Sequence, residues 1–279
     1  MQTGRASKTA LRVAIRRAAH QLVEDPRILH DPVVMRLLGP GFERDLERAS
    51  HKVARDFRGF MAARSRYAED RLWAAVGAGV EQYVVLGAGL DTFAYRNPFP
   101  NLRVFEVDFP ATQEWKRSLL ADASIHVPDD LTFVPLDFEH KTLREGLADA
   151  GFDGGNAAFF GWLGVVPYLS RDAVRATLRT IAQLPEGSGV TFDYALTPEH
   201  MSPTRRAAFD ALAARVAAAG EPFQLFFSPE ELEAELREAG FHAIEHMDSE
   251  RLNGTYFRDR SDGLQLPPEG LGMMATAWV

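Results

Sequence analysis

The sequence predicts an α/β fold in which a parallel sheet follows a helical N-terminal segment. Short apolar segments that end in glycine or aspartate alternate with helical stretches from Glu81 onward, a pattern typical of βαβ units. Before that point, residues 1 to about 78 show only the helical spacing of apolar residues. The chain has 279 residues, 46% of them hydrophobic and 25% charged, which is enough to bury a large core.

The N-terminal segment contains two predicted helical stretches. In the first, Leu11, Ala14, Ala18 and Leu22 recur at the three- and four-residue spacing of one helix face. The second stretch repeats this spacing over a longer range. Its apolar positions are Val53, Phe57, Phe60, Met61, Tyr67, Leu72 and Val76.

The rest of the chain predicts five strands with helices between them, and residues 241–247 and 273–279 are expected to form closing strands. Ser228 and Glu231 form a capping box at the start of a later helix, which Gly240 ends. The five strands are expected at Tyr83–Gly87, Arg103–Asp108, Thr132–Asp137, Ala157–Gly164 and Ser188–Ala195, and the helices between them at 110–123, 141–149 and 170–183.

These elements indicate how the chain is organised. We predict a helical extension or cap over residues 1–78 and an α/β core over residues 79–279. Within the core, a helical insertion is expected near residues 199–220, where Phe209 and Leu212 share a face. No segment has the composition of a linker.

Composition excludes several classes of function. The chain has no cysteine, so disulfides, cysteine-ligated zinc and a thiol nucleophile are excluded. A net charge of -8 argues against sequence-independent nucleic-acid binding, which depends on Lys and Arg. His242 and His246 are four residues apart, but they follow Gly240 in a predicted strand, so no metal site is expected.

No segment is long enough to span a membrane, since the longest mostly apolar run, Ala157–Leu169, has 13 residues. Arg12, Arg16 and Arg17 interrupt any apolar stretch near the N-terminus, which argues against a secretory signal. The first residues are basic up to Glu24, as in a transit peptide, and a surface helix with a basic face gives the same pattern. We predict a cytoplasmic protein, and the sequence leaves its oligomeric state open.

The strongest local motif is Gly87-Ala88-Gly89 at the end of an apolar strand. Glycines at such a turn let the backbone approach a ligand closely, and open α/β sheets bind ligands at the carboxyl ends of their strands. Asp108 ends the next strand, 21 positions after Gly87, where a carboxylate can accept both hydroxyls of an adenosine ribose. Asp137 ends the third strand, where it can contact the adenine.

This spacing fits two cofactors, a nicotinamide dinucleotide and S-adenosylmethionine. The dinucleotide motif G-x-G-x-x-G/A requires a small third position and places a pyrophosphate at the start of a helix. Here Thr92 occupies the third position and Asp91 adds a negative charge beside it, which argues against a pyrophosphate. S-adenosylmethionine carries no phosphate and has a positive sulfonium, so it tolerates an acidic turn.

Six segments carry a resemblance to a known family. VVLGAGLDTFAYR (84–96), VFEVDFPATQEWKR (104–117) and VPLDFE (134–139) resemble the leucine carboxyl methyltransferase family, most closely its bacterial S-adenosylmethionine-dependent O-methyltransferases. The same likeness is found in residues 9–39, in ARSRYAED (63–70) and in FFGWLGVVPYLSRDAV (159–174). The likeness covers most of the chain and weakens after about residue 200. It implies a class I methyltransferase Rossmann-like fold, whose mostly parallel sheet has seven strands with the last one antiparallel and helices on both faces.

The resemblance also implies an S-adenosylmethionine site. Gly87 and Gly89 correspond to the turn under the methionine part of the cofactor. Asp108 corresponds to the acid that binds the ribose, and Asp137 lies among the adenine contacts. The implied cofactor-binding residues are Arg64 or Arg66, Gly87, Ala88, Gly89, Asp108, Phe109, Asp137, Phe138 and Trp162.

Two details of this implied site stay open. An N-terminal arginine of the family binds the cofactor carboxylate, and Arg64 and Arg66 both match; one of them is expected instead to pair with Glu69 or Asp70 on the same helix. The family often has a glutamate after its fourth strand, where this chain has Leu163. This departure implies that another group binds the cofactor's amino group, that the affinity for the cofactor is lower, or that the site has been adapted.

Methyl transfer requires an acceptor aligned behind the sulfonium methyl. A carboxylate acceptor is already ionised at pH 7, whereas a hydroxyl acceptor benefits from a general base. Tyr168, Asp193 and His200 are candidate bases, but each also has a structural interpretation, and we name no catalytic residue. Trp162, Tyr168 and Tyr194 are candidates for an acceptor pocket.

We therefore predict an S-adenosylmethionine-dependent O-methyltransferase that acts on a carboxylate or hydroxyl of a small molecule, such as an aromatic or polyketide acid. The family also contains enzymes that methylate a protein C-terminus. An NAD(P)-dependent oxidoreductase is the first alternative, against which Asp91 and Thr92 argue. A non-catalytic S-adenosylmethionine-binding protein is the second, and Leu163 is the residue that favours it.

Overall fold

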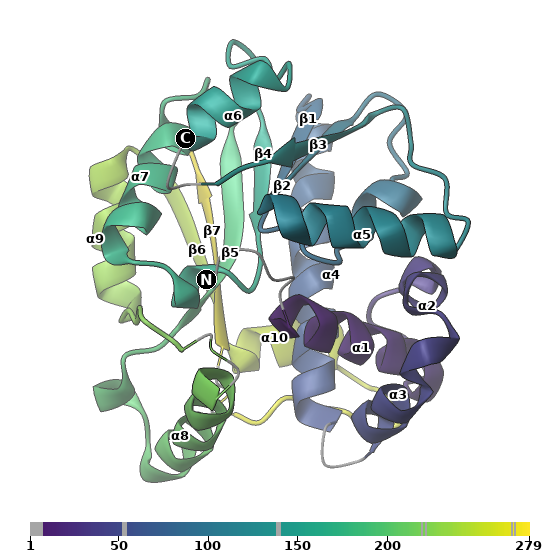
Figure 1. The fold of residues 1–279 in the computed structure, drawn as a ribbon. Coiled ribbons are helices and arrows are strands. Elements are labelled where there is room, and N and C mark those ends of the chain that lie inside the picture. The colour runs from purple at the N-terminus through teal and green to yellow at the C-terminus, as the bar shows by residue number, and fades with distance from the viewer. Residues whose placement is uncertain are drawn as a thin grey trace.

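The structure is a computed structural model that describes residues 8–51, 55–137, 141–218, 220, 222–268, 270 and 272–279. A single seven-stranded sheet lies at its centre (Figure 1). The five strands expected from the sequence and the two closing strands are all present, with ends within two residues of those predicted. The strands are β1 (Gln82–Leu86), β2 (Arg103–Asp108), β3 (Leu131–Pro135), β4 (Phe159–Trp162), β5 (Gly189–Ala195), β6 (Ala243–Met247) and β7 (Gly272–Trp278).

The strands lie in the order β3-β2-β1-β4-β5-β7-β6. Strands β1 to β5 are parallel, and β7 is antiparallel to both β5 and β6. The sheet that the family resemblance implies is thus confirmed. Strand order reverses between β1 and β4, and ligands of open α/β sheets bind beside such a reversal. Gly87 and Asp108 lie at this carboxyl edge.

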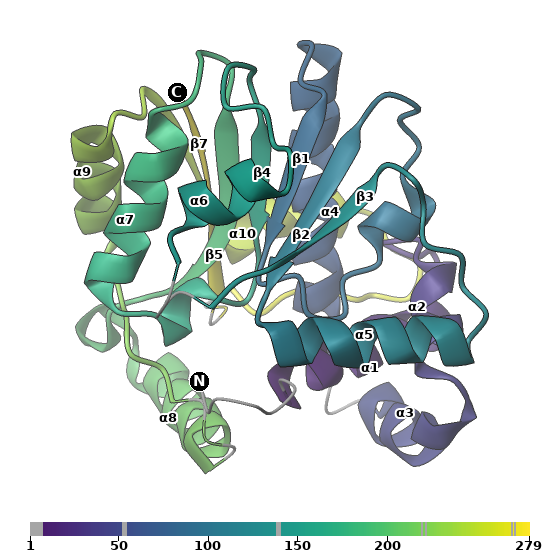
Figure 2. The same cartoon turned by 45° about the horizontal axis from the view of Figure 1, so that its top comes forward.

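Helices cover both faces of the sheet (Figures 1 and 2). On one face, α6 (Leu143–Asp149), α7 (Arg171–Ala182) and α9 (Pro229–Ala239) bury residues such as Val174 against Phe160. On the other face, α4 (Arg55–Gly77) packs residues such as Leu72 against Tyr83. Further helices in this part of the chain are α5 (Pro110–Asp122) and α10 (Ser249–Tyr256), with the short η3 (Phe93–Arg96), η4 (Val166–Tyr168) and η5 (Pro198–His200) between other elements.

The described part of the N-terminal segment is helical, as predicted, and α1 packs against α2, α3 and α4. Ala14 and Ala18 are buried on α1, whereas Leu22 is 57% exposed on its last turn. Val53, one of the expected apolar positions, lies outside the described residues. The boundary near residue 78 stays a prediction. The remaining elements are α1 (Lys8–Val23), α2 (Pro32–Leu38), η1 (Pro40–Phe42), α3 (Glu43–Ser50) and, within the expected insertion, α8 (Pro203–Ala218).

Helix ends follow their sequence signals. Ser228 accepts a hydrogen bond from the Glu231 amide, and the Glu231 carboxylate accepts one from the Ser228 amide, so the capping box is present. Gly240 ends this helix with φ +115°, a conformation that favours glycine. Among the described residues, no helix combines the length and apolar character needed to cross a membrane.

Candidate functional site

The turn after β1 is formed by two glycines with left-handed backbone, φ +65° at Gly87 and +47° at Gly89. A Cβ atom on Gly87 would lie 2.4 Å from Cγ2 of Val165, and one on Gly89 would lie 2.9 Å from Cβ of Ala10. The sequence predicts that these glycines allow a ligand to approach the backbone closely. The structure shows that neighbouring protein atoms already exclude a side chain at both positions.

Asp108 joins the end of β2 to this turn. Its Oδ2 accepts a hydrogen bond from the Gly89 amide at 2.5 Å, and its Oδ1 accepts one from the Phe109 amide at 2.6 Å. Burial raises the pKa of the Asp108 carboxyl above its usual value, and the two amide donors oppose this rise. The structure therefore brings together the glycine turn and the acid that the sequence predicts to bind a ribose.

The end of β3 lies beside the same edge. The Leu136 amide donates to the Asp108 carbonyl at 2.9 Å, so the backbone of the next residue, Asp137, lies near the end of β2. Asp137 is partly buried, and its carbonyl accepts a hydrogen bond from the Lys141 amide at 3.0 Å. Phe138, the other predicted adenine contact, lies outside the described residues.

The chain after the glycine turn does not enter a long helix. Residues 93–96 form only the short η3, and β2 follows. Dinucleotide sites place the pyrophosphate at the N-terminus of a helix in this position, where aligned amides favour negative charge. Asp91 accepts from the Phe93 amide at 2.7 Å and lies 3.5 Å from Arg17. The local structure thus argues against a dinucleotide more strongly than the motif does.

A buried polar network behind this turn was missed in the sequence. Arg17 donates to both Asp31 and Thr92, and Thr92 donates to both Asp31 oxygens at 2.8 Å. The interpretation of α1 as a surface helix with a basic face is wrong for Arg17, which is buried. A signal was available, because Arg17 lies three residues after Ala14 and so shares its buried face.

The structure separates the two candidate arginines. Arg64 is 5% exposed, and its Nη1 donates to Oδ2 of Asp193 at 2.8 Å. Arg66 is exposed and donates from Nε to Asp70 at 2.8 Å, four residues along the same helix. Glu69, the other expected helix partner, instead binds Arg96. The same-helix interpretation therefore describes Arg66.

The segment after β4 lies beside Arg64 and Asp193. The Gly164 amide donates to Oδ1 of Asp193 at 2.5 Å. Gly164 has φ +72°, and a Cβ there would lie 3.0 Å from Nη1 of Arg64. Leu163, where the family often has glutamate, packs in an apolar cluster that includes Tyr67.

The aromatic candidates Trp162 and Tyr168 pack against other rings. Trp162 is 2% exposed and packs on Phe192 within the core, with ring centroids 6.1 Å apart. Tyr168 packs on Phe223 at 5.2 Å. The roles of Trp162 and Tyr168 in cofactor or acceptor binding stay predictions. The side chain of His200 lies outside the described part of the chain.

Tyr194 is buried, and its hydroxyl bonds to Nδ1 of His246 at 2.9 Å. His246 lines an open cavity of about 400 Å³ at the end of β6, together with Met273 and Arg251 among others. An acceptor role for Tyr194 stays a prediction. Within the described residues, no group of three His, Asp or Glu side chains is arranged to hold a metal ion.

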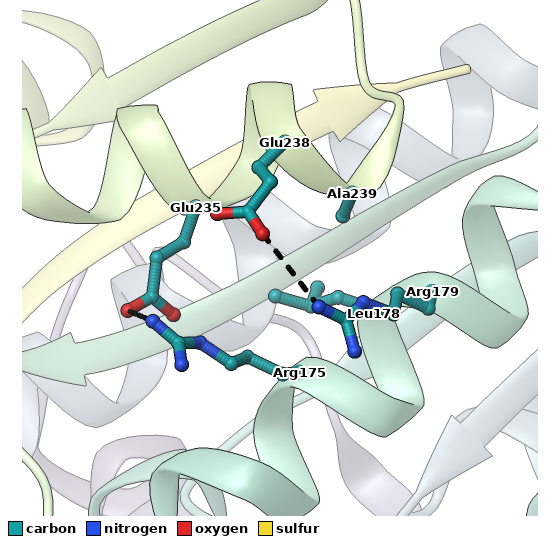
Figure 3. Close-up of a pocket in the computed structure, with 6 residues that line it drawn as sticks. All are labelled: Arg175, Leu178, Arg179, Glu235, Glu238 and Ala239. Carbon is teal, nitrogen blue, oxygen red and sulfur yellow. Dashed lines mark hydrogen bonds and ion pairs between the residues drawn. The ribbon is translucent and has the colours of Figure 1, made fainter.

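A second, much smaller cavity of about 10 Å³ lies between α7 and α9 (Figure 3). Two ion pairs line it, with Arg175 3.0 Å from Glu235 and Arg179 3.7 Å from Glu238. Its volume is about that of one water position. Because α7 and α9 cover the face of the sheet opposite α4, this cavity is separate from Arg64.

Comparison with known proteins decides the family. Residues 10–182, more than half of the chain, match the profile of leucine carboxyl methyltransferases. The chain belongs to the leucine carboxyl methyltransferase family. "Putative S-adenosyl-L-methionine-dependent methyltransferase YktD" of Bacillus subtilis is 37% identical over 205 residues, which cover 72% of this chain and 67% of that protein. A Mycolicibacterium paratuberculosis protein with the same description is 32% identical over 71% of this chain, but only 40% of its own length is covered.

Solved structures show the same fold. A "putative methyltransferase" from Thermobifida fusca superposes with a TM-score of 0.57 at 21% identity, covering 87% of this chain and 91% of that one. The S-adenosylmethionine-dependent methyltransferase SibL superposes with a TM-score of 0.51 at 16% identity, covering 96% and 69%. The class I methyltransferase fold and the methyltransferase class predicted from the sequence are confirmed. Membership of this family leaves the oxidoreductase alternative without support.

Proposed function

We propose that this member of the leucine carboxyl methyltransferase family methylates an oxygen of a small molecule, a carboxylate or a hydroxyl, with S-adenosylmethionine as the methyl donor. S-adenosylmethionine supplies a methyl group on a sulfonium, which an acceptor oxygen displaces in line. The observation that carries the proposal is the junction of the Gly87–Gly89 turn with Asp108, at the edge where Arg64 is buried.

The residues at this edge fit the donor. An ionised carboxylate offers about four acceptor positions, and the Gly89 and Phe109 amides use two at Asp108, so acceptor capacity remains for a ribose hydroxyl. The backbone of Asp137 lies near the end of β2. We expect it to contact the adenine attached to that ribose. Arg64 offers the planar fork that suits a carboxylate, and its Nε has no hydrogen-bond partner among the described residues.

Among acceptors, a carboxylate needs no general base because it is ionised at neutral pH. Asp193, one of the three candidate bases, is bonded to Arg64 and to the Gly164 amide. A carboxylate acceptor therefore agrees best with the groups at this edge, and we would test carboxylic acids before phenols.

Calorimetric titration of the purified protein with S-adenosylmethionine, S-adenosylhomocysteine and NADH tests the donor. We expect micromolar binding of the first two and none of NADH; the reverse result would contradict the proposal. Transfer of a labelled methyl group to a panel of carboxylic acids and phenols then tests the reaction. Binding without any transfer would support the non-catalytic alternative.

Two arginine variants test the assignment of the donor carboxylate. Arg64→Met should weaken binding of S-adenosylhomocysteine by roughly 1.5–3 kcal/mol, the range for hydrogen bonds to a charged group. Arg66→Met, the matched control on the same helix, should leave affinity unchanged.

Asp108→Ala should weaken binding of S-adenosylhomocysteine by a similar 1.5–3 kcal/mol. Equal affinities of a folded Asp108→Ala variant and the wild type would remove Asp108 from the site.

A further inference from the structure

A buried ion pair at the carboxyl edge of the sheet joins α4 to β5. Arg64 donates from Nη1 to Oδ2 of Asp193 at 2.8 Å, and both residues are less than a tenth exposed. The Gly164 amide donates to Oδ1 of the same carboxylate at 2.5 Å. The pair therefore lies against the segment that follows β4.

This segment connects the ion pair to the glycine turn. A Cβ on Gly164 would lie 3.0 Å from the Arg64 guanidinium, so bare backbone faces the cation. The next residue, Val165, fills the space where a Cβ of Gly87 would lie. Two consecutive residues, Gly164 and Val165, thus connect the ion pair to the glycine turn. The proposed function places this turn under the methionine part of the cofactor.

A buried ion pair contributes little to stability, because the cost of removing two charges from water offsets their attraction. Both partners here also keep unused hydrogen-bonding capacity. Nε of Arg64 is buried with no partner in the described chain, and hydrogen bonds from Arg64 and Gly164 take two of the about four acceptor positions of Asp193. A cation and an anion side by side complement a ligand that carries an anion and a cation on one carbon.

We propose that Asp193 binds the ammonium group of the cofactor's methionine end, while Arg64 binds the adjacent carboxylate. This inference rests on the proposed function and adds the residue that selects for an α-amino acid. Asp193 then has a binding role instead of the role of a general base. Without its charge, the ammonium group would face the buried Arg64 cation with no compensating anion.

Other acids near this edge have different partners. Asp91 lies beside Arg17, and Asp108 is bonded to the Gly89 and Phe109 amides. Glu69 binds Arg96. Asp193 is the acid to which Arg64 itself is bonded.

The experiment measures calorimetric affinities of wild type, Asp193→Asn and Asp70→Asn for three thioadenosines. S-adenosylhomocysteine carries both groups, its decarboxylated form keeps only the ammonium, and 5′-S-(3-carboxypropyl)-5′-thioadenosine keeps only the carboxylate. Asp193→Asn should weaken the first two by roughly 10- to 100-fold and leave the third within twofold. Asp70 is a partly exposed acid on α4, and Asp70→Asn should change none of these affinities.

The opposite pattern, with only the carboxylate ligands weakened, would show that Asp193 merely positions Arg64, and would overturn the inference. Unchanged affinities in Asp193→Asn would also overturn it while leaving the proposed function intact. If the wild type binds no S-adenosylhomocysteine, the proposed function itself fails. A crystal structure of wild type with S-adenosylhomocysteine needs no variant: an ammonium within about 3.2 Å of Asp193 supports the inference, and a larger separation with another acid in contact overturns it.

Discussion

Replacing Asp31 by asparagine should destabilise the protein strongly, because Asp31 holds three segments together. Its carboxylate accepts from Arg17 on α1 and from Thr92, which follows the glycine turn. It also accepts from the Val34 amide at 3.1 Å as the N-cap of α2. Arg17 and Asp31 are both buried, so asparagine leaves a buried cation without its anion.

The magnitude follows from which contacts each variant removes. Breaking a buried ion pair by removing one partner costs about 3–5 kcal/mol. Asp91, 3.5 Å from Arg17, partly compensates the lost charge, so we expect about 3 kcal/mol for Asp31→Asn. Asparagine still caps α2, whereas alanine does not, so Asp31→Ala should cost about 1 kcal/mol more.

Urea unfolding followed by circular dichroism measures these differences, with Thr92→Val as a control that removes one neutral hydroxyl and should cost about 1 kcal/mol. A loss below 1 kcal/mol in Asp31→Asn would refute the argument from buried charge.

Burial alone raises the pKa of Asp31, but Arg17 and Arg96 outweigh it and hold that pKa below its usual value. The wild type should therefore lose this stability as pH falls through the lowered pKa, and Asp31→Asn should lose less over the same range.

Gly87→Ala should cost about 2–5 kcal/mol in urea unfolding, from left-handed backbone and a clash with Val165, whereas Gly77→Ala, with open space around it, should not destabilise. Glu106 and Lys116 form a buried pair at 2.6 Å, and burial raises the pKa of Glu106 to about 7 despite that lysine. The native state then binds more protons than the unfolded state between about pH 4.5 and 7, so this group lowers stability as pH rises. The slope of unfolding free energy against pH should lose this contribution in Glu106→Gln; an unchanged slope would contradict the assignment.

Much of the fold could be predicted because its signals are local. The strand Arg103–Asp108 has the predicted bounds, and Ser228, Glu231 and Gly240 mark their helix as expected. Periodicity, caps and glycine turns depend on a few neighbouring residues, so one sequence is enough to read them. Asp108 was found in the same way, since its place at a strand end is a local property.

Contacts between distant residues could not be predicted in the same way. Arg64 meets Asp193, 129 positions along the chain, and nothing near Arg64 indicates that partner. Helical spacing did contain a clue to the choice of arginine. Tyr67 and Ala68, three and four residues after Arg64, are buried, whereas Asp70, four residues after Arg66, is a partly exposed acid.

The same contacts bear on the predicted boundary near residue 78. Tyr67 on α4 donates to Glu245 at 3.2 Å and accepts from Thr276, which ties this helix to β6 and β7. Parallel sheets fold with both faces covered, and Leu72 packs against the face that a fragment 79–279 would expose. We therefore expect this fragment to lack a cooperative urea transition, even though the boundary separates helical from alternating sequence. A cooperative transition with native circular dichroism would instead show that the N-terminal helices are an addition to an independent core. Such a core would also lack Arg64, so it should bind S-adenosylhomocysteine more weakly than the whole chain does.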